Sequence, residues 1–117
     1  MALKTRYGWA EIDGVRYDHD IIIHADRRVT KRSKKEAKKY KKKFGHTPLI
    51  AEELAFVAEE NPAIVFIGTG QYGDLPVTGE AQEFLEPYSP VIRTTPEILE
   101  LIAEETRSFV AILHVNC

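Results

Sequence analysis

Cysteine is nearly absent from this chain of 117 residues, in which Cys117 is the single example. A disulfide within the chain is therefore impossible, and this scarcity is typical of proteins from reducing compartments. No apolar run approaches the ~20 residues needed to cross a bilayer. The opening residues, MALKTRYGWAEIDG, also lack the apolar core of a secretory signal. We therefore expect a cytoplasmic protein without a membrane span.

The sequence also lacks a recognisable metal or catalytic motif. Its histidines, His19, His24, His46 and His114, are not spaced with another histidine, cysteine or carboxylate as zinc ligands are. His114 and Cys117 lie three residues apart, which supplies only half of a zinc site. A nucleophilic Cys117 would need a neighbouring base and a lowered thiol pKa, and a chain terminus is a poor place for either. We predict no metal, no cofactor and no catalytic residue, and the balance is against an enzyme.

Charge is distributed very unevenly along the chain. The basic segment, Arg27–Lys43, holds eleven lysines or arginines and one acid, Glu36, a net charge of +10. The rest of the chain holds five basic and seventeen acidic residues, a net charge of −12. The overall charge of −2 therefore says little about partners, and the local potential says more.

The length and the apolar pattern predict one α/β domain covering residues 1–117. Alternating apolar residues predict strands over 7–12 and 15–23, joined by an Asp13-Gly14 turn. A capping box at Ser33 and a glycine at position 45 predict a helix over 34–44. Periodicity beyond this point predicts helices over 49–60, 80–85 and 95–107 and buried strands over 63–67, 91–93 and 109–115. Helices that alternate with short apolar strands favour a sheet covered on both faces.

Gly68, Gly70 and Gly73 match the G-x-G-x-x-G pattern of dinucleotide-binding loops, directly after a predicted buried strand. In that fold a helix begins at once and directs its amides at the pyrophosphate. Here Pro76 and Gly79 follow, and both oppose such a helix. We predict that the glycines serve tight backbone geometry. A small anion or ligand site is the alternative, formed by Gly68, Thr69, Gly70 and Gln71 with Arg93 or His114.

The basic segment is the second candidate site. Lysines cover most of the predicted helix, and such a surface binds phosphates in a salt-dependent way. The segment lacks asparagine and glutamine and has few aromatic residues, so sequence-specific base readout is disfavoured. A solvated face with no partner also stays open. The candidate contact residues are Arg27, Arg28, Lys31, Arg32, Lys34, Lys35, Lys38, Lys39, Lys41 and Lys42.

Four stretches, YGWAEIDGVRYDHDIIIH, FGHTPLIAEEL, VFIGTG and AILHVNC, resemble a small family of mostly uncharacterised proteins. The family contains archaeal and bacterial single-domain proteins, an adipogenesis-associated cytosolic protein of animals, and a mitochondrial assembly factor for respiratory complex I. The resemblance covers nearly the whole chain in order. It implies a three-layer α/β fold with a mixed central sheet and an N-terminal β-hairpin layer. It implies no established activity and, for the mitochondrial branch, a helper role in complex assembly.

Together these features predict a non-enzymatic intracellular binding or assembly-helper protein that uses residues 31–43 as its contact surface. A protein partner is favoured over nucleic acid. The alternatives are nucleic-acid binding and anion or small-ligand binding. An enzyme acting on a phosphorylated ligand at the glycine loop is the least favoured.

Overall fold

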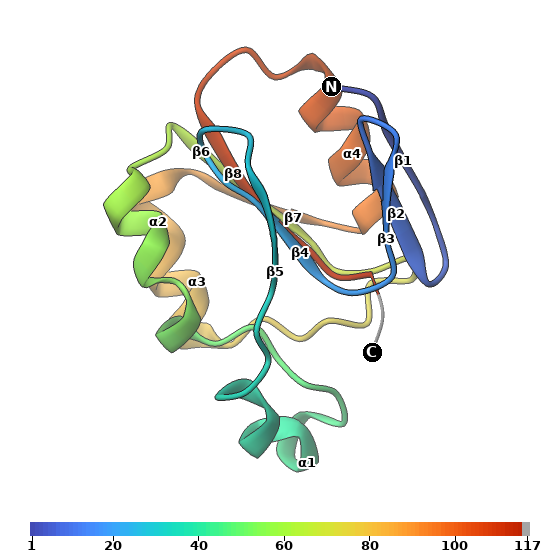
Figure 1. Ribbon diagram of the computed structural model, residues 1–117. Coiled ribbons are helices and arrows are strands. Elements are labelled where there is room, and N and C mark those ends of the chain that lie inside the picture. The colour runs from blue at the N-terminus through green and yellow to red at the C-terminus, as the bar shows by residue number, and fades with distance from the viewer. Residues whose placement is uncertain (116–117) are drawn as a thin grey trace.

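The computed structural model describes residues 1–115 and contains two sheets (Figure 1). The smaller is an antiparallel sheet of β1 (Leu3–Arg6), β2 (Trp9–Ile12) and β3 (Val15–Tyr17). The larger has the order β5-β4-β8-β6-β7. Its strands are β4 (Ile21–Ile23), β5 (Val29–Lys31), β6 (Ile64–Gly68), β7 (Pro90–Arg93) and β8 (Phe109–Leu113).

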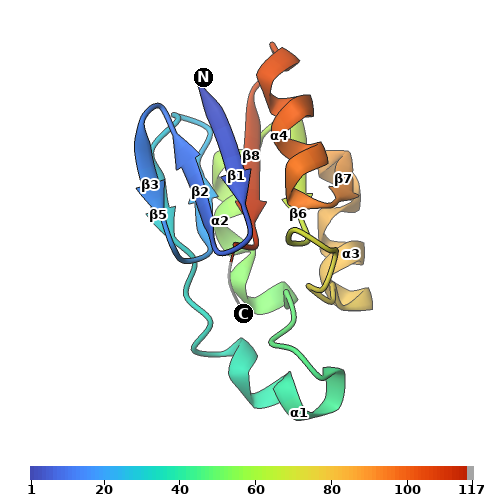
Figure 2. The ribbon, with the colours of Figure 1, turned by 90° about the vertical axis from the view of Figure 1, so that its right-hand side faces the viewer.

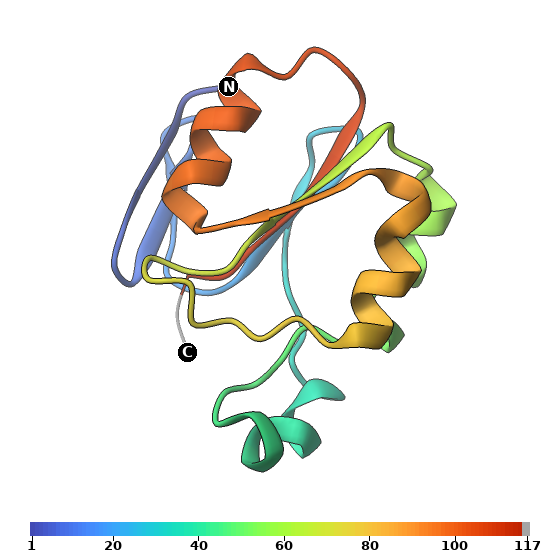
Figure 3. The ribbon, with the colours of Figure 1, turned by 180° about the vertical axis from the view of Figure 1, so that it is seen from behind.

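The larger sheet is mixed, because β6, β7 and β8 run parallel while β4 and β5 are antiparallel to their neighbours. Helix α3 (Gly79–Leu85) connects β6 to β7, and α4 (Thr95–Glu104) connects β7 to β8. Helix α2 (Ala55–Glu60) lies beside α3, whereas α4 lies on the other side of the sheet together with the small sheet (Figures 1 and 3). The predicted α/β class, mixed sheet and N-terminal hairpin layer are confirmed.

Side-chain alternation along the buried strands gives the protein two cores, one on each face of the larger sheet. Phe66, Ala111 and Leu113 pack against α4 and β2. Val65, Ile67 and Ile112 pack against α2 and α3. Both β6 and β8 are buried along their whole length, which explains their continuous apolar sequences.

The N-terminal half differs from the predicted element boundaries. Strands β1 and β5 are additional to the prediction, and the strand expected over 15–23 divides into β3 and β4. The division has a topological cause, since the chain leaves the small sheet after Tyr17 and joins the larger one at Ile21. The Asp13-Gly14 turn is confirmed, with φ of 49° and 85° at its two residues.

Three predicted helices are shorter than expected, and the one predicted over 95–107 ends as α4 at Glu104. Residues 34–44 form a 3₁₀ turn, η1 (Ala37–Tyr40), followed by a single α turn, α1 (Lys41–Phe44). Ala37 is the only buried residue of these two turns, and neighbouring lysines repel one another at helical spacing. Residues 49–60 likewise form a 3₁₀ turn, η2 (Ala51–Glu53), before α2. The segment that contains η1 and α1 projects from the body of the protein (Figure 2).

Candidate functional site

Strand register brings several polar residues together at one edge of the larger sheet. Ile21 pairs with both Lys31 and Leu113, and Leu113 also pairs with Gly68. The residues immediately beyond this row are Asp20, Arg32, His114 and Thr69. This edge is also where the parallel strands end, the usual location of ligand sites in α/β sheets.

Asp20 is the centre of this group, and its side chain is fully buried. Oδ1 accepts a hydrogen bond from the Val115 amide at 2.7 Å. Oδ2 lies 2.9 Å from Nη1 of Arg32, 2.8 Å from Nδ1 of His114 and 3.3 Å from Nζ of Lys34. A carboxylate with so many donors, two of them permanent or near-permanent cations, is held in its ionised form.

Arg32 connects this edge of the sheet to the loop that precedes α2. Its Nε and Nη2 donate to the two carboxylate oxygens of Glu53 at 2.6 and 3.1 Å, and Nη2 also donates to the Pro48 carbonyl. Burial lowers the pKa of the Arg32 guanidinium, but the hydrogen bonds and charges of Glu53 and Asp20 outweigh burial and raise it. We call Asp20, Arg32, Lys34, Glu53 and His114 the buried charge cluster.

The glycine loop, Gly68–Gly73, packs closely against His114. A Cβ atom on Gly70 would lie 2.7 Å from Cδ2 of His114, and Gly70 has a φ of 102°. A Cβ atom on Gly68 would lie 2.8 Å from Oγ1 of Thr95, which donates to the His114 carbonyl. The loop therefore leaves room for the imidazole and for the threonine that anchors the His114 backbone. This is a packing role for the glycines that the sequence pattern alone does not reveal.

Two amides at the start of this loop are already engaged within the protein. The Thr69 amide donates to the Arg93 carbonyl, and the Gly70 amide donates to Oγ1 of Thr95. Gln71 is half-buried. The Arg93 guanidinium bonds the neighbouring Ile92 carbonyl and borders a separate hollow beside α4. Of the predicted ligand residues, the structure brings Gly68, Thr69, Gly70 and His114 together, and the Arg93 side chain lies elsewhere.

The predicted contact residues of the basic segment also divide into groups. Arg32 is 2% exposed, so its assignment to an exposed surface is corrected. Lys34 is half-buried beside Asp20, and the Arg27 guanidinium stacks 4.1 Å above the Phe109 ring. Arg28 is exposed beside Asp26. The remaining members belong to a set of seven exposed lysines, the lysine surface, which comprises Lys31, Lys35, Lys38, Lys39, Lys41, Lys42 and Lys43.

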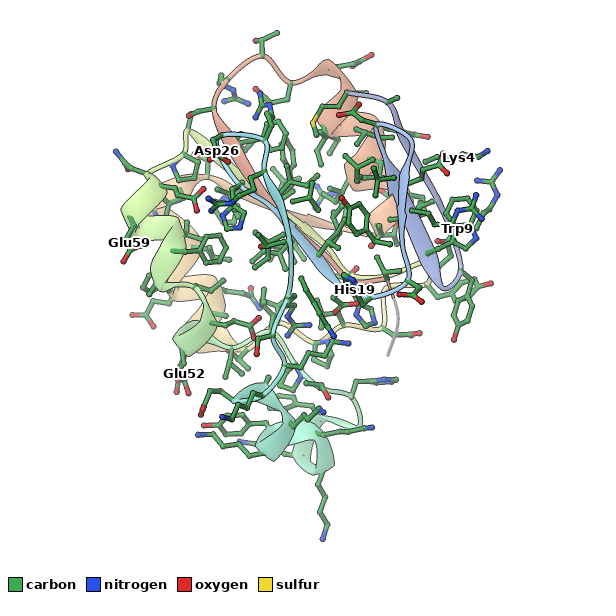
Figure 4. The ribbon with its side chains drawn as sticks, in the orientation of Figure 1. Lys4, Trp9, His19, Asp26, Glu52 and Glu59 are labelled. Atoms are coloured by element: carbon green, nitrogen blue, oxygen red, sulfur yellow. The ribbon has the colours of Figure 1, made fainter. Side chains whose placement is uncertain are left out.

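Two hollows border the buried charge cluster. An open groove of about 640 Å³ is lined by residues 18–20 on one side and by Lys31, Lys35 and Lys38 on the other, with Arg32 and Lys34 also in its lining. His19, on the rim of this groove, is labelled in Figure 4. A smaller and more enclosed cavity of about 20 Å³ is lined by Lys34, Lys41, His46, Thr47 and His114.

Residues 1–115 contain no group of three or more histidine, cysteine, aspartate or glutamate side chains placed to hold a metal ion. The prediction for Cys117 lies outside the described residues. No helix in the described part of the chain is long and apolar enough to cross a membrane. The cluster combines the His114 imidazole and the cations of Arg32 and Lys34 with the carboxylates of Asp20 and Glu53, and these groups bond one another.

The sequence prediction missed Asp20 and Glu53 as members of the site. Asp20 stands just before an apolar triplet, where an acidic residue is indistinguishable from one in an ordinary turn. Glu53 lies in an acidic stretch with no distinguishing neighbour. The register of β4 against β5 and β8 places Asp20 beside His114, and the hydrogen bonds from Arg32 bring Glu53 to the same group.

Neither the protein-family models nor the curated proteins compared with this sequence match it. Solved structures do match. A conserved hypothetical protein from Pyrococcus horikoshii OT3 is 34% identical over 100% of both chains, with a TM-score of 0.86. A protein designated MT938 is 30% identical over 97% of this chain and 96% of its own, with a TM-score of 0.79. A protein from Xanthomonas campestris shares the fold alone, at 16% identity and a TM-score of 0.64 over 97% of this chain and 83% of its own.

Identity of this level over the full length goes beyond a shared fold. The chain belongs to the same family of small conserved proteins as the hypothetical protein of Pyrococcus horikoshii.

Proposed function

We propose that this chain is a non-enzymatic binding protein whose lysine surface docks an acidic face of another protein. The observation that carries the proposal is the exposure of seven lysines on a projecting segment, with Glu36 as the one acid among residues 31–43 (Figure 2). Seven lysines against one glutamate leave a local charge of +6. The groove of about 640 Å³ beside them provides concave shape as well as charge.

The way the segment is fixed supports a role in contact. Near the beginning of residues 31–43, Arg32 bonds Asp20 and Glu53. In the middle of this segment, the side chain of Ala37 is buried. Among the described residues, the lysine surface forms one ion pair with the acid of this segment, between Lys39 and Glu36 at 3.8 Å. That pair is exposed and contributes little to stability. A backbone fixed at these points, with exposed lysine charges outside strong ion pairs, suits electrostatic recognition of a partner.

A protein partner is favoured over nucleic acid because the segment offers few groups for reading bases. It contains no asparagine or glutamine, and Tyr40 and Phe44 are its only nearby aromatic residues. An assembly-helper role is the narrower form of the proposal, and it rests on the resemblance to a complex I assembly factor. An enzyme at the glycine loop is less favoured, because the Thr69 and Gly70 amides are engaged within the fold.

The test compares partner capture from extracts of the source organism by three forms of the protein. The wild type is set against K35E/K38E/K39E and against a control, K4E/R6E/R16E, which reverses exposed charges on the small sheet. We expect a specific partner that is retained by the control and lost by the first variant. Identical partners for the wild type and K35E/K38E/K39E would contradict the proposal.

Nucleic acid is tested separately with short labelled DNA and RNA. Binding through the lysine surface would weaken steeply as salt rises, because displaced counterions drive the association. Tight binding with such a slope, abolished in K35E/K38E/K39E, would favour nucleic acid over a protein partner. No binding at about 50 mM salt would remove nucleic acid from consideration.

A further inference from the structure

The helical layer on one side of the larger sheet carries acidic residues and no lysine or arginine. Between Lys43 and Arg93 the chain contains neither residue type, and this stretch includes η2, α2, α3 and the 3₁₀ turn η3 (Glu86–Tyr88). Five exposed acids lie on these elements, and we call them the glutamate face: Glu52, Glu59, Glu80, Glu83 and Glu86. Figure 4 shows Glu52 and Glu59 pointing away from the body of the protein.

The charge of the glutamate face is not neutralised within the fold. Glu53 and Glu60, in the same layer, bond Arg32 and His24. Within residues 1–115, by contrast, none of the five members of the glutamate face forms an ion pair with a lysine or an arginine. Five carboxylates without a cation among them present a local charge of −5 to solvent. This value nearly matches the +6 of the lysine surface.

The lysine surface and the glutamate face meet at a hollow of about 310 Å³. The basic segment lines it with Tyr40, Lys43 and Phe44, and the glutamate face lines it with Glu52 and Glu80. Phe44 is 37% exposed and is one of the few large apolar side chains that the fold leaves at the surface. The boundary between the two signs of charge therefore coincides with a partly apolar hollow.

A surface with this arrangement is complementary to itself. A twofold axis through the boundary places the lysine surface of one copy on the glutamate face of the other, and the same contact occurs twice. The two hollows then face each other, which removes the exposed Phe44 rings from water. A partner with acidic charge alone would be attracted by the lysine surface but repelled by the adjoining glutamate face. A second copy satisfies both surfaces at once.

We propose that the partner of the lysine surface is a second copy of this chain, bound through its glutamate face in a twofold-symmetric dimer. The inference rests on the docking function proposed above and names its partner. Contacts between lysines and glutamates set the orientation of the two copies, and the Tyr40 and Phe44 rings form the apolar centre of the interface. Because exposed charges provide much of the attraction, the dimer weakens as salt rises.

Sedimentation velocity of the full chain tests the dimer, because it separates the monomer from a species of twice its mass. We expect a monomer–dimer equilibrium whose dissociation constant rises about tenfold or more between roughly 50 and 500 mM sodium chloride. A chain that stays monomeric at low salt and about 1 mM protein would overturn the proposal without recourse to any variant. A dimer that salt does not weaken would contradict its electrostatic basis.

A complementary pair of variants locates the interface. K35E/K38E/K39E alters the lysine surface, and E80K/E83K/E86K alters the glutamate face. Each variant alone should dimerise about tenfold more weakly than the wild type or worse, because the attraction between the two surfaces is removed or reversed. Equal amounts of both should recover dimers, since the unaltered surfaces of the two variants carry opposite charge. A mixture that stays monomeric would contradict the pairing of these surfaces.

The control for charge reversal elsewhere is K4E/R6E/R16E on the small sheet, which should dimerise as the wild type does. Equal weakening by this control and by E80K/E83K/E86K would refute the glutamate face as the interface. Circular dichroism of each variant verifies the fold, and recovery of dimers in the mixture verifies it independently.

The results also separate this inference from the docking function. A monomeric wild type that captures a different protein, with capture lost in K35E/K38E/K39E, would refute the dimer and support the docking function. The absence of both dimers and a captured partner would refute both. Dimers that the mixed variants restore would support both, and the captured partner is then the chain itself.

Discussion

At the scale of single residues, Gly70 determines whether the His114 ring can occupy its position. A Cβ atom at this position would meet an imidazole carbon at 2.7 Å, closer than van der Waals contact allows. The positive φ of Gly70 adds strain for any other residue. Gly79 provides a contrast, because a Cβ atom there would meet nothing within 4 Å.

We expect Gly70→Ala to lower the free energy of unfolding by about 1–3 kcal/mol, because it overpacks a buried site and strains the backbone. It should also shift the NMR signals of the His114 ring. Urea denaturation and NMR spectra measure the two effects. The control, Gly79→Ala, should be neutral or slightly stabilising. Equal effects of the two substitutions would show that Gly70 has no special packing role.

At the scale of elements, the short strand β5 depends on the side chain that follows it. Strand β5 has three residues, none of them buried, so its own apolar contacts are few. Arg32 comes next and bonds Asp20 at the start of β4 and Glu53 in η2. The buried ion pairs therefore fix both the edge strand and the part of the basic segment that follows it.

We expect Arg32→Met to lower the free energy of unfolding by about 3–5 kcal/mol, since it leaves Glu53 and part of the Asp20 charge without their partner. Arg28→Met removes an exposed arginine of the same segment and should change stability by less than about 0.5 kcal/mol. Chemical denaturation of both variants measures the difference. A small loss in Arg32→Met would mean that Lys34 and His114 compensate Asp20 by themselves.

The same elements show where sequence patterns succeed and fail. Strands β6 and β8 are long apolar runs buried on both faces, so the sequence predicts them well. Strand β5, with the sequence VTK, is too short for periodicity and exists because it pairs with β4. The candidate site follows this division. The sequence names His114 as a candidate because it belongs to the strand predicted over 109–115. The place of its partner Asp20 depends on a contact between residues 94 positions apart, which the sequence does not reveal.

At the scale of the whole molecule, the small sheet and the larger sheet share one core. Ala10 and Ile12 of β2 belong to the same apolar cluster as Ile98 of α4 and Phe66 of β6. The single-domain prediction for residues 1–117 requires that these parts unfold together.

Trp9, the one tryptophan, reports on the small sheet, where its ring lies under the Arg16 guanidinium at 3.7 Å. Helical content is located in the rest of the fold and is followed by far-ultraviolet circular dichroism. We expect urea transitions with the same midpoint by tryptophan fluorescence and by circular dichroism. An earlier fluorescence transition would show that the small sheet is a separate unfolding unit.

The two outer strands of the larger sheet also restrict how the protein meets other chains. Strand β7 begins with Pro90, which has no amide proton to offer, and β5 is brief and ends at Lys31. Proline, lysine and short length are the features that keep sheet edges from recruiting foreign strands. Fibre-like stacking of copies through these edges is thereby disfavoured. At these two edges, contact with another chain would consequently depend on side-chain identity more than on backbone pairing.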